Sequence, residues 1–216
     1  MWLGDSLSVS AFWSDVFKVC AILFTCFNVY FFKRRWLLSL RPFLLIAIIL
    51  IIATGRATLC LQPENYDLGW LILGLIMGHG LFLLSLAINR LSTVEPLSYI
   101  ASSKSHLAYV YEHPSILLRS LLTAFYEELL WRGTIIYLLG NSSLAVIVAS
   151  LWFISIHLHK RKELIWVEWL DLLLFSISLG FLFLATTNLL FVTVIHAVRN
   201  INVICFVRQQ KNTPSG

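Results

Sequence analysis

Seven apolar runs, each long enough to cross a lipid bilayer, follow one another along this chain. They lie at about 13–32, 42–60, 68–89, 115–139, 143–158, 165–186 and 188–207. A backbone in lipid has to satisfy its own polar groups, and an α-helix does so within each run. Because 59% of the 216 residues are hydrophobic and only 12% are charged, we expect an all-α, polytopic transmembrane helical bundle of about seven spans.

Lysine and arginine occupy every second loop between these runs. Twelve basic residues follow the first, third, fifth and seventh runs or begin the fourth, whereas the alternate loops hold only Arg56. Basic residues collect on the cytoplasmic side of membrane proteins, so the N-terminus is predicted outside and the C-terminus in the cytoplasm. The net charge of +5 therefore reflects topology and does not indicate a nucleic-acid partner.

The segment 91–114 is the only long stretch that does not span. It mixes aromatic, apolar and charged residues with two prolines, which favours helices lying on the cytoplasmic surface, with a disordered loop as the alternative. We expect an N-terminal three-span region at 1–114 that includes this segment. A core of four spans at 115–207 and a polar cytoplasmic tail at 208–216 would follow.

The fourth run contains the sequence FYEELLWRG at 125–133. Each ionised side chain costs about 2.5–3.5 kcal/mol at the centre of a membrane helix. Glu128 and Arg132 are four residues apart and can neutralise each other on one helix face. Glu127 lies about 100° further around the helix, which leaves it free as a candidate general base. The alternative is a buried pair that only fixes helix packing, with Glu127 facing a cytoplasmic vestibule.

Two later runs carry further polar residues at helical spacing. His157 follows Phe153 by four residues, and His196 precedes Asn200 by four. A histidine and an asparagine on one face are neutral donors suited to an oxyanion, although polar residues in membranes also form purely structural hydrogen bonds between helices. Taken alone, His157 near a helix end is more typical of an interface. Arg199 is turned away from the His196 face and is expected to extend towards the cytoplasm.

Three motifs in this order resemble the CAAX protease and bacteriocin-processing family (CPBP, also called Abi). Its members are glutamic intramembrane endopeptidases related to the Ras-converting CAAX prenyl protease. The motifs are EExxxR followed by glycine, FxxxH and HxxxN: Glu127–Gly133, Phe153–His157 and His196–Asn200. The resemblance covers about residues 115–205. Trp131 stands where phenylalanine is usual, and the first hundred residues resemble nothing beyond membrane spans.

The resemblance implies three pairs of site residues. They are a catalytic pair that activates water, a catalytic pair that stabilises the tetrahedral oxyanion, and a supporting pair: Glu127 and His157, His196 and Asn200, and Glu128 and Arg132. It also implies no metal and no cofactor. The expected substrate is a membrane-anchored or lipid-associated protein or peptide, cleaved near its C-terminus in the inner membrane of a prokaryotic cell. Its identity, its prenylation and the oligomeric state of the enzyme stay open.

Three alternatives remain beside the protease. A non-catalytic scaffold or immunity protein would be favoured by loss of a motif residue, and none is lost. A zinc endopeptidase using His157, His159 and His196 would lack the HExxH spacing. A proton-coupled transporter would draw on Glu168 and Asp171 in the sixth run, which we expect to be interfacial and solvated because they lie close to its start.

Overall fold

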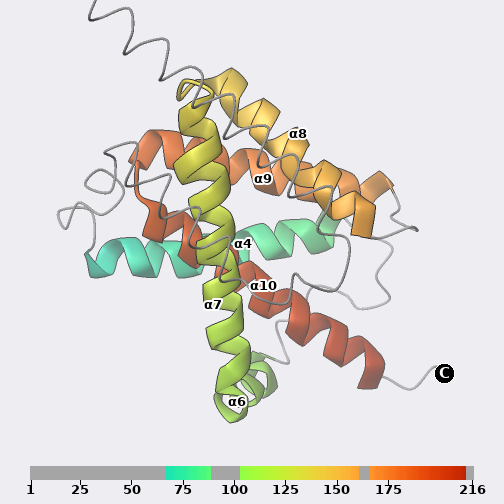
Figure 1. The fold of residues 1–216 in the computed structure, drawn as a ribbon. Helices are drawn as coiled ribbons and strands as arrows, with labels where there is room; N and C mark the ends of the chain where they lie inside the picture. The colour runs from blue at the N-terminus through green and yellow to red at the C-terminus, as the bar shows by residue number, and fades with distance from the viewer. Residues whose placement is uncertain (1–66, 89–102, 161–165, 213–216) are drawn as a thin grey trace, which may run out of the picture. The chain divides into compact units, whose positions relative to one another are not determined.

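The computed structural model describes residues 67–88, 103–160 and 166–212, all within one compact unit, Ala47–Gly216 (Figure 1). Within these ranges the chain is helical apart from short turns, and they contain no strand. The elements are α4 (Leu68–Ile88), α6 (Ser103–Glu112), α7 (Pro114–Glu128), the π-helix η3 (Leu129–Ile136), α8 (Ser143–Lys160), α9 (Trp166–Thr186) and α10 (Leu189–Asn212). The all-α prediction is confirmed for this part of the chain.

Three of the helices are long and apolar enough to cross a membrane: Leu68–Ile88, Trp166–Thr186 and Leu189–Arg208. The apolar part of α8, Ser143–Ser155, is shorter. The predicted runs at 13–32 and 42–60 lie outside the described residues. The total of seven spans, the orientation of the termini and the three-part division of the chain stay predictions.

Local signals explain where the central helices begin and end. Pro114 stands in the first turn of α7, where its missing N–H breaks no hydrogen bond. Gly140 has φ +96°, a left-handed conformation that favours glycine and closes the helix after η3. The Oγ of Ser142 then accepts a hydrogen bond of 3.1 Å from the backbone N–H of Ala145 and caps α8.

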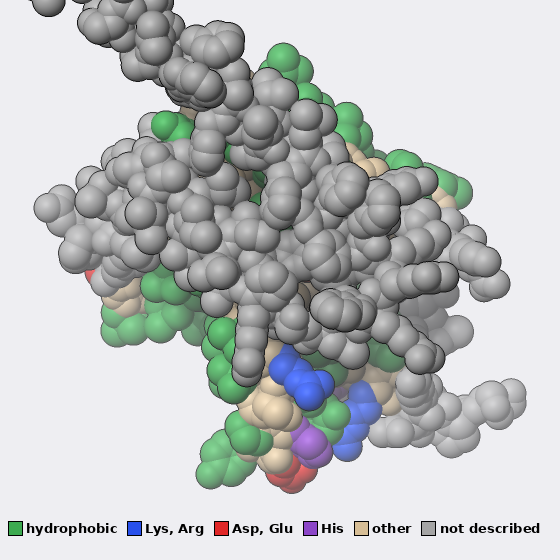
Figure 2. All heavy atoms as spheres, in the orientation of Figure 1, with side chains coloured by type: hydrophobic (Ala, Val, Ile, Leu, Met, Phe, Trp, Pro, Cys, Tyr) green, Lys and Arg blue, Asp and Glu red, His purple; other side chains and the backbone are tan. Residues whose placement is uncertain are grey.

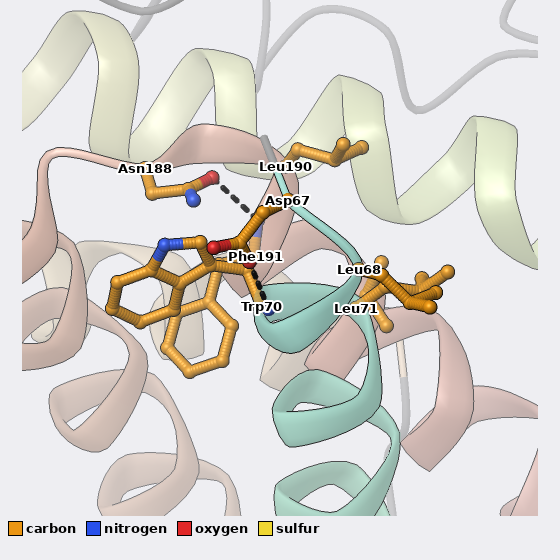
Figure 3. Close-up of a pocket in the computed structure, with 8 residues that line it drawn as sticks. Asp67, Leu68, Trp70, Leu71, Asn188, Leu190 and Phe191 are labelled. Carbon is orange, nitrogen blue, oxygen red and sulfur yellow. Dashed lines mark hydrogen bonds between the residues drawn. The ribbon is translucent and has the colours of Figure 1, made fainter. Parts of the chain in front are cut away.

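Helices α4 and α10 both begin with a side-chain cap. Asp67 accepts a 2.9 Å hydrogen bond from the backbone N–H of Trp70, and Asn188 accepts one of 2.9 Å from that of Phe191. The rings of Trp70 and Phe191 meet edge to face with centroids 5.0 Å apart. These two helix starts line a mainly apolar pocket of about 300 Å³ (Figure 3). None of its lining residues belongs to the three motifs.

Two glycines bring α4 against α10. A methyl group added at Gly74 would lie 3.0 Å from the Cγ1 of Val194, and one added at Gly78 would lie 2.7 Å from the Cβ of Val198. Small residues four apart allow membrane helices to approach closely. This contact packs α4 against the face of α10 that carries Val194 and Val198.

Helix α6 lies in the segment for which we expected interfacial helices. Figure 2 shows basic, acidic and histidine side chains gathered around α6, whereas hydrophobic side chains cover most of the other coloured surface. Arg208 of α10 lies over the ring of Tyr109, with 3.6 Å between its Cζ and the ring centroid. Residues 103–112 are therefore an ordered helix and not the alternative loop, and residues 91–102 lie outside the described residues.

Candidate functional site

The acidic motif stands where α7 changes into the π-helix η3. Glu127 and Glu128 end α7, and Arg132 lies in the middle of η3. The hydroxyl of Thr134 donates a hydrogen bond of 3.0 Å to the carbonyl oxygen of Leu129, five residues earlier, which fits the wider π-helical turn. Short π-helical segments inside α-helices are frequent at functional sites.

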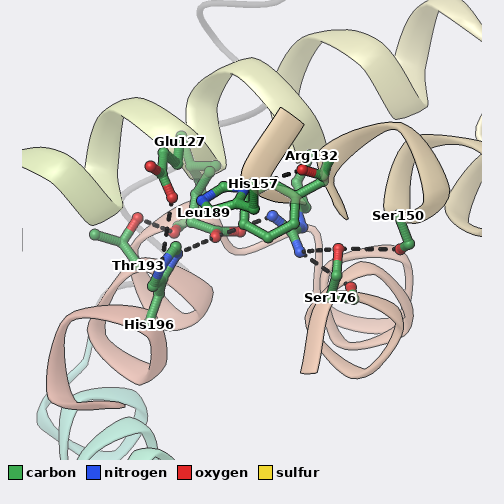
Figure 4. A network of polar contacts seen from close by, with 10 residues as sticks. Glu127, Arg132, Ser150, His157, Ser176, Leu189, Thr193 and His196 are labelled. Carbon is green, nitrogen blue, oxygen red and sulfur yellow. Dashed lines mark hydrogen bonds and ion pairs between the residues drawn. The ribbon is translucent and has the colours of Figure 1, made fainter. Parts of the chain in front are cut away.

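The predicted pair of Glu128 and Arg132 is confirmed and deeply buried. The Nη1 of Arg132 donates to Oε1 of Glu128 over 3.1 Å, and the two side chains are 2% and 0% exposed. The Nη2 of Arg132 donates to the carbonyl oxygen and to the Oγ of Ser176 in α9, both over 3.0 Å. The Oγ of Ser176 donates in turn to Oγ of Ser150 in α8, over 3.1 Å (Figure 4). The guanidinium is thus hydrogen-bonded to residues of α7 and α9, and Ser176 extends the network to α8.

His196 joins the two glutamates. Its Nδ1 lies 2.6 Å from Oε1 of Glu128, and its Nε2 lies 3.5 Å from Oε2 of Glu127. Figure 4 shows Glu127 and His196 pointing towards each other from α7 and α10. The expectation that Glu128 serves Arg132 alone and that Glu127 is free is therefore incomplete, because His196 contacts both carboxylates.

His157 is half-buried and reaches this cluster through an aromatic neighbour. Its Nδ1 lies 2.9 Å from the carbonyl oxygen of Phe153, and the two rings lie 4.2 Å apart between centroids. The Phe153 ring centroid is 5.5 Å from Cζ of Arg132. Trp131 packs edge-on against Phe153, with centroids 5.7 Å apart, so the tryptophan in place of the usual phenylalanine is accommodated within an aromatic cluster.

The remaining predicted residue, Asn200, is half-buried and lies one turn beyond His196 on the same face of α10. The expectation for its neighbour Arg199 is wrong. Instead of extending towards the cytoplasm, Arg199 is buried and its Nη2 lies 2.6 Å from Oδ2 of Asp171. Asp171 is accordingly not a solvated interfacial group, because its side chain is only 13% exposed. The ion pair between α9 and α10 offsets the cost of removing these two charges from water. The spacing of residues along a single helix could not predict this partner.

Reasoning from the sequence missed Ser150 and Ser176. Both are buried and extend the polar cluster from Arg132 into α8 and α9. The signal available was the presence of small hydroxyl residues inside apolar runs, where they commonly bond across helices. That signal is weak because such serines also bond to their own backbone, as Ser155 does with the carbonyl oxygen of Trp152.

Within residues 67–88, 103–160 and 166–212, no three His, Cys, Asp or Glu side chains come together in an arrangement that could hold a metal ion.

Apolar helices that enclose two glutamates, an arginine and a histidine define a polytopic membrane protein with a polar centre in its interior, where ionisable groups are rarely without a function. Residues 105–202 match the family model described as Type II CAAX prenyl endopeptidase Rce1-like. That family is a protease family, and the match confirms the resemblance found in the motifs. No curated protein and no solved structure gives a match.

Proposed function

We propose that the chain is a glutamic intramembrane endopeptidase whose reaction centre lies between Glu127 and His196. The observation that carries this proposal is the position of His196, with Nδ1 at 2.6 Å from Glu128 and Nε2 at 3.5 Å from Glu127. A general base and a hydrogen-bond donor from different helices then face the same small volume, as hydrolysis of an amide requires.

The hydrogen bond to Glu128 fixes the tautomer of His196. A carboxylate only accepts hydrogen bonds, so Nδ1 carries a proton and donates it to Oε1 of Glu128. Nε2 is then the ring atom that faces the reacting groups. For Nε2 to donate to an oxyanion as well, the ring has to carry two protons, and the charges of Glu127, Glu128, Arg132 and His196 would then sum to zero.

In the reaction we propose, Glu127 and His157 hold a water molecule. Glu127 accepts a proton as the water oxygen attacks the scissile carbonyl carbon, and the carbonyl oxygen becomes an oxyanion. His196 and Asn200 donate hydrogen bonds to that oxyanion. The proton then passes from Glu127 to the leaving amine as the carbon–nitrogen bond breaks, and no covalent intermediate forms.

Glu128 and Arg132 act through other residues. Glu128 is fully buried, and its single bonded oxygen, Oε1, accepts from both Arg132 and His196. Arg132 is held by Ser176. These contacts support a role for the pair in holding His196 at the junction of α7 and α10, which is the bracing role expected from the family.

The substrate we propose is a membrane-anchored or lipid-associated protein cleaved near its C-terminus. The match to the Rce1-like family supports a peptide substrate in a membrane setting. The loop charges support an opening to the cytoplasm, and we place the chain in a prokaryotic inner membrane as a processing or sorting enzyme.

The proposal is tested by cleavage with purified protein. Candidate substrates are a farnesylated CAAX peptide, a bacteriocin leader peptide and a C-terminal membrane-anchor sorting signal. We expect one of them to be cleaved by the wild type, to stay intact with Glu127→Ala, and to be cleaved equally well after treatment with a chelator. Undiminished cleavage by Glu127→Ala would remove the mechanism. Loss of cleavage with the chelator alone would favour a zinc enzyme.

A further inference from the structure

A second buried ionic cluster lies outside the three motifs. Asp171 of α9 and Arg199 of α10 form an ion pair of 2.6 Å whose side chains are 13% and 9% exposed. Ser85 of α4 completes the cluster: its hydroxyl donates to Oδ1 of Asp171 and accepts from Nη2 of Arg199 over 3.4 Å. The cluster therefore joins α4, α9 and α10.

Stability alone does not account for this cluster. Removing two charges from water is costly, and a buried ion pair is often no more stabilising than apolar residues of similar volume. The Nε of Arg199 is buried and has no hydrogen-bond partner among the described residues, which adds to that cost. A buried pair is better explained by the geometry that it imposes on its neighbours.

Phe175 connects this cluster to the candidate site. Its ring is buried in α9, and the Cζ of Arg199 lies over it at 4.3 Å from the centroid. The same ring meets the imidazole of His196 edge to face, with centroids 5.3 Å apart and an angle of 78° between the rings. Phe175 thus contacts both the second ion pair and the histidine that joins Glu127 and Glu128.

We propose that Asp171, Arg199 and Phe175 are positioning residues for His196. Asp171 fixes the guanidinium of Arg199, the guanidinium fixes the Phe175 ring, and the ring limits rotation of the imidazole. Glu128 anchors only Nδ1 of that imidazole, so a second contact is needed to keep Nε2 directed at Glu127. Arg199 also directly precedes Asn200 in α10, so its anchoring fixes the turn that carries both proposed oxyanion donors. Only the consequence for catalysis rests on the proposed function.

The test uses three variants of the full chain in detergent. The double variant Asp171→Leu/Arg199→Met replaces the ion pair with apolar side chains of comparable size. Phe175→Leu removes the ring and keeps the ion pair, so it remains informative if the double variant fails to fold. Asn202→Leu is the matched control, because Asn202 of α10 forms a different polar contact between α4 and α10, to His79 over 2.9 Å.

The first readout is the ¹⁵N NMR spectrum of histidine-labelled protein, with the His196 signals assigned by their loss in His196→Gln. We expect the Nδ1 and Nε2 shifts of His196 to change in both Phe175→Leu and the double variant, and to stay as in the wild type in Asn202→Leu. This readout needs no substrate, so it decides the positioning role even if the proposed protease function is wrong.

The second readout is cleavage kinetics. We expect kcat to fall by about 10- to 100-fold with KM unchanged in Phe175→Leu and in the double variant, since small misplacements of catalytic groups have effects of this size. Unchanged His196 shifts in a folded Phe175→Leu would overturn the positioning role. Shifts that move with no change in kcat would contradict its importance for catalysis, and absence of Glu127-dependent cleavage in the wild type would contradict only the proposed function.

Discussion

The Nδ1 of His196 lies 2.6 Å from Oε1 of Glu128, although the two residues are 68 positions apart in the sequence. The same oxygen of Glu128 accepts from Arg132. One carboxylate oxygen therefore ties α10 to the arginine at the centre of η3. Because the side chains of Glu128 and Arg132 are only 0% and 2% exposed, loss of either of these two leaves the other charge buried without its ion-pair partner.

Removing one member of this pair should destabilise the protein strongly. We predict that Glu128→Gln and Arg132→Gln each lower the free energy of unfolding by about 3–5 kcal/mol, the range found when one partner of a buried ion pair is lost. Thermal unfolding in detergent measures the effect, with Glu112→Gln as the exposed control. If either buried variant unfolds at the wild-type temperature, the pair is not a structural element.

The contact of α4 with α10 should depend on Gly78 and not on its near neighbour Gly80. A methyl group at Gly78 would lie 2.9 Å from the carbonyl oxygen of Ile195, a backbone atom that cannot rotate away, whereas one at Gly80 meets nothing within 4 Å. We predict that Gly78→Ala destabilises by about 1–3 kcal/mol and that Gly80→Ala does not destabilise. Equal unfolding temperatures for the two variants would argue against the close helix contact.

Ser176 should support Arg132 through its side chain. Ser176→Ala removes one acceptor of Arg132 and one donor to Ser150, and each lost hydrogen bond to a charged group is worth about 1.5–3 kcal/mol. Ser155→Ala is the control, because that hydroxyl bonds only locally in α8 and is exposed. Denaturant titration should show a loss in the first variant and little change in the second. The reverse order would contradict the network.

The predicted orientation is open to a reporter test in a bacterial host. Alkaline phosphatase, which is active only outside the cytoplasm, should be active when fused after Asn141 and inactive when fused after Gly216. The loops that place these positions on opposite sides differ in basic residues, twelve against one. Activity at both fusion points would show that the charge pattern has been misread.

Relationships within one helix could be predicted from the sequence. The i, i+4 spacing of Glu128 and Arg132 and that of His196 and Asn200 follow from helical geometry alone. Both helices were recognisable because long apolar runs leave few alternatives in lipid. The motif residues were found for the same reason, since charges stand out in such runs.

Relationships between helices could not be predicted in the same way. The contact of His196 with Glu128 depends on how α7 packs against α10, and no spacing in the sequence reports that packing. The error over Arg199 has the same origin, because its partner Asp171 lies 28 residues earlier on α9. The π-helix η3 was also missed, since its residues, Leu129–Ile136, have a composition that suits an α-helix equally well.

The most direct test of the central claim follows the oxygen of the attacking water. Membranes from cells that lack the protein are incubated in H₂¹⁸O with purified wild type, Glu127→Gln or Glu112→Gln, and new C-termini are identified by mass spectrometry. We predict ¹⁸O-labelled C-termini of membrane proteins with the wild type and with Glu112→Gln, and their loss with Glu127→Gln. Equal labelling by Glu127→Gln would contradict hydrolysis by a Glu127-activated water.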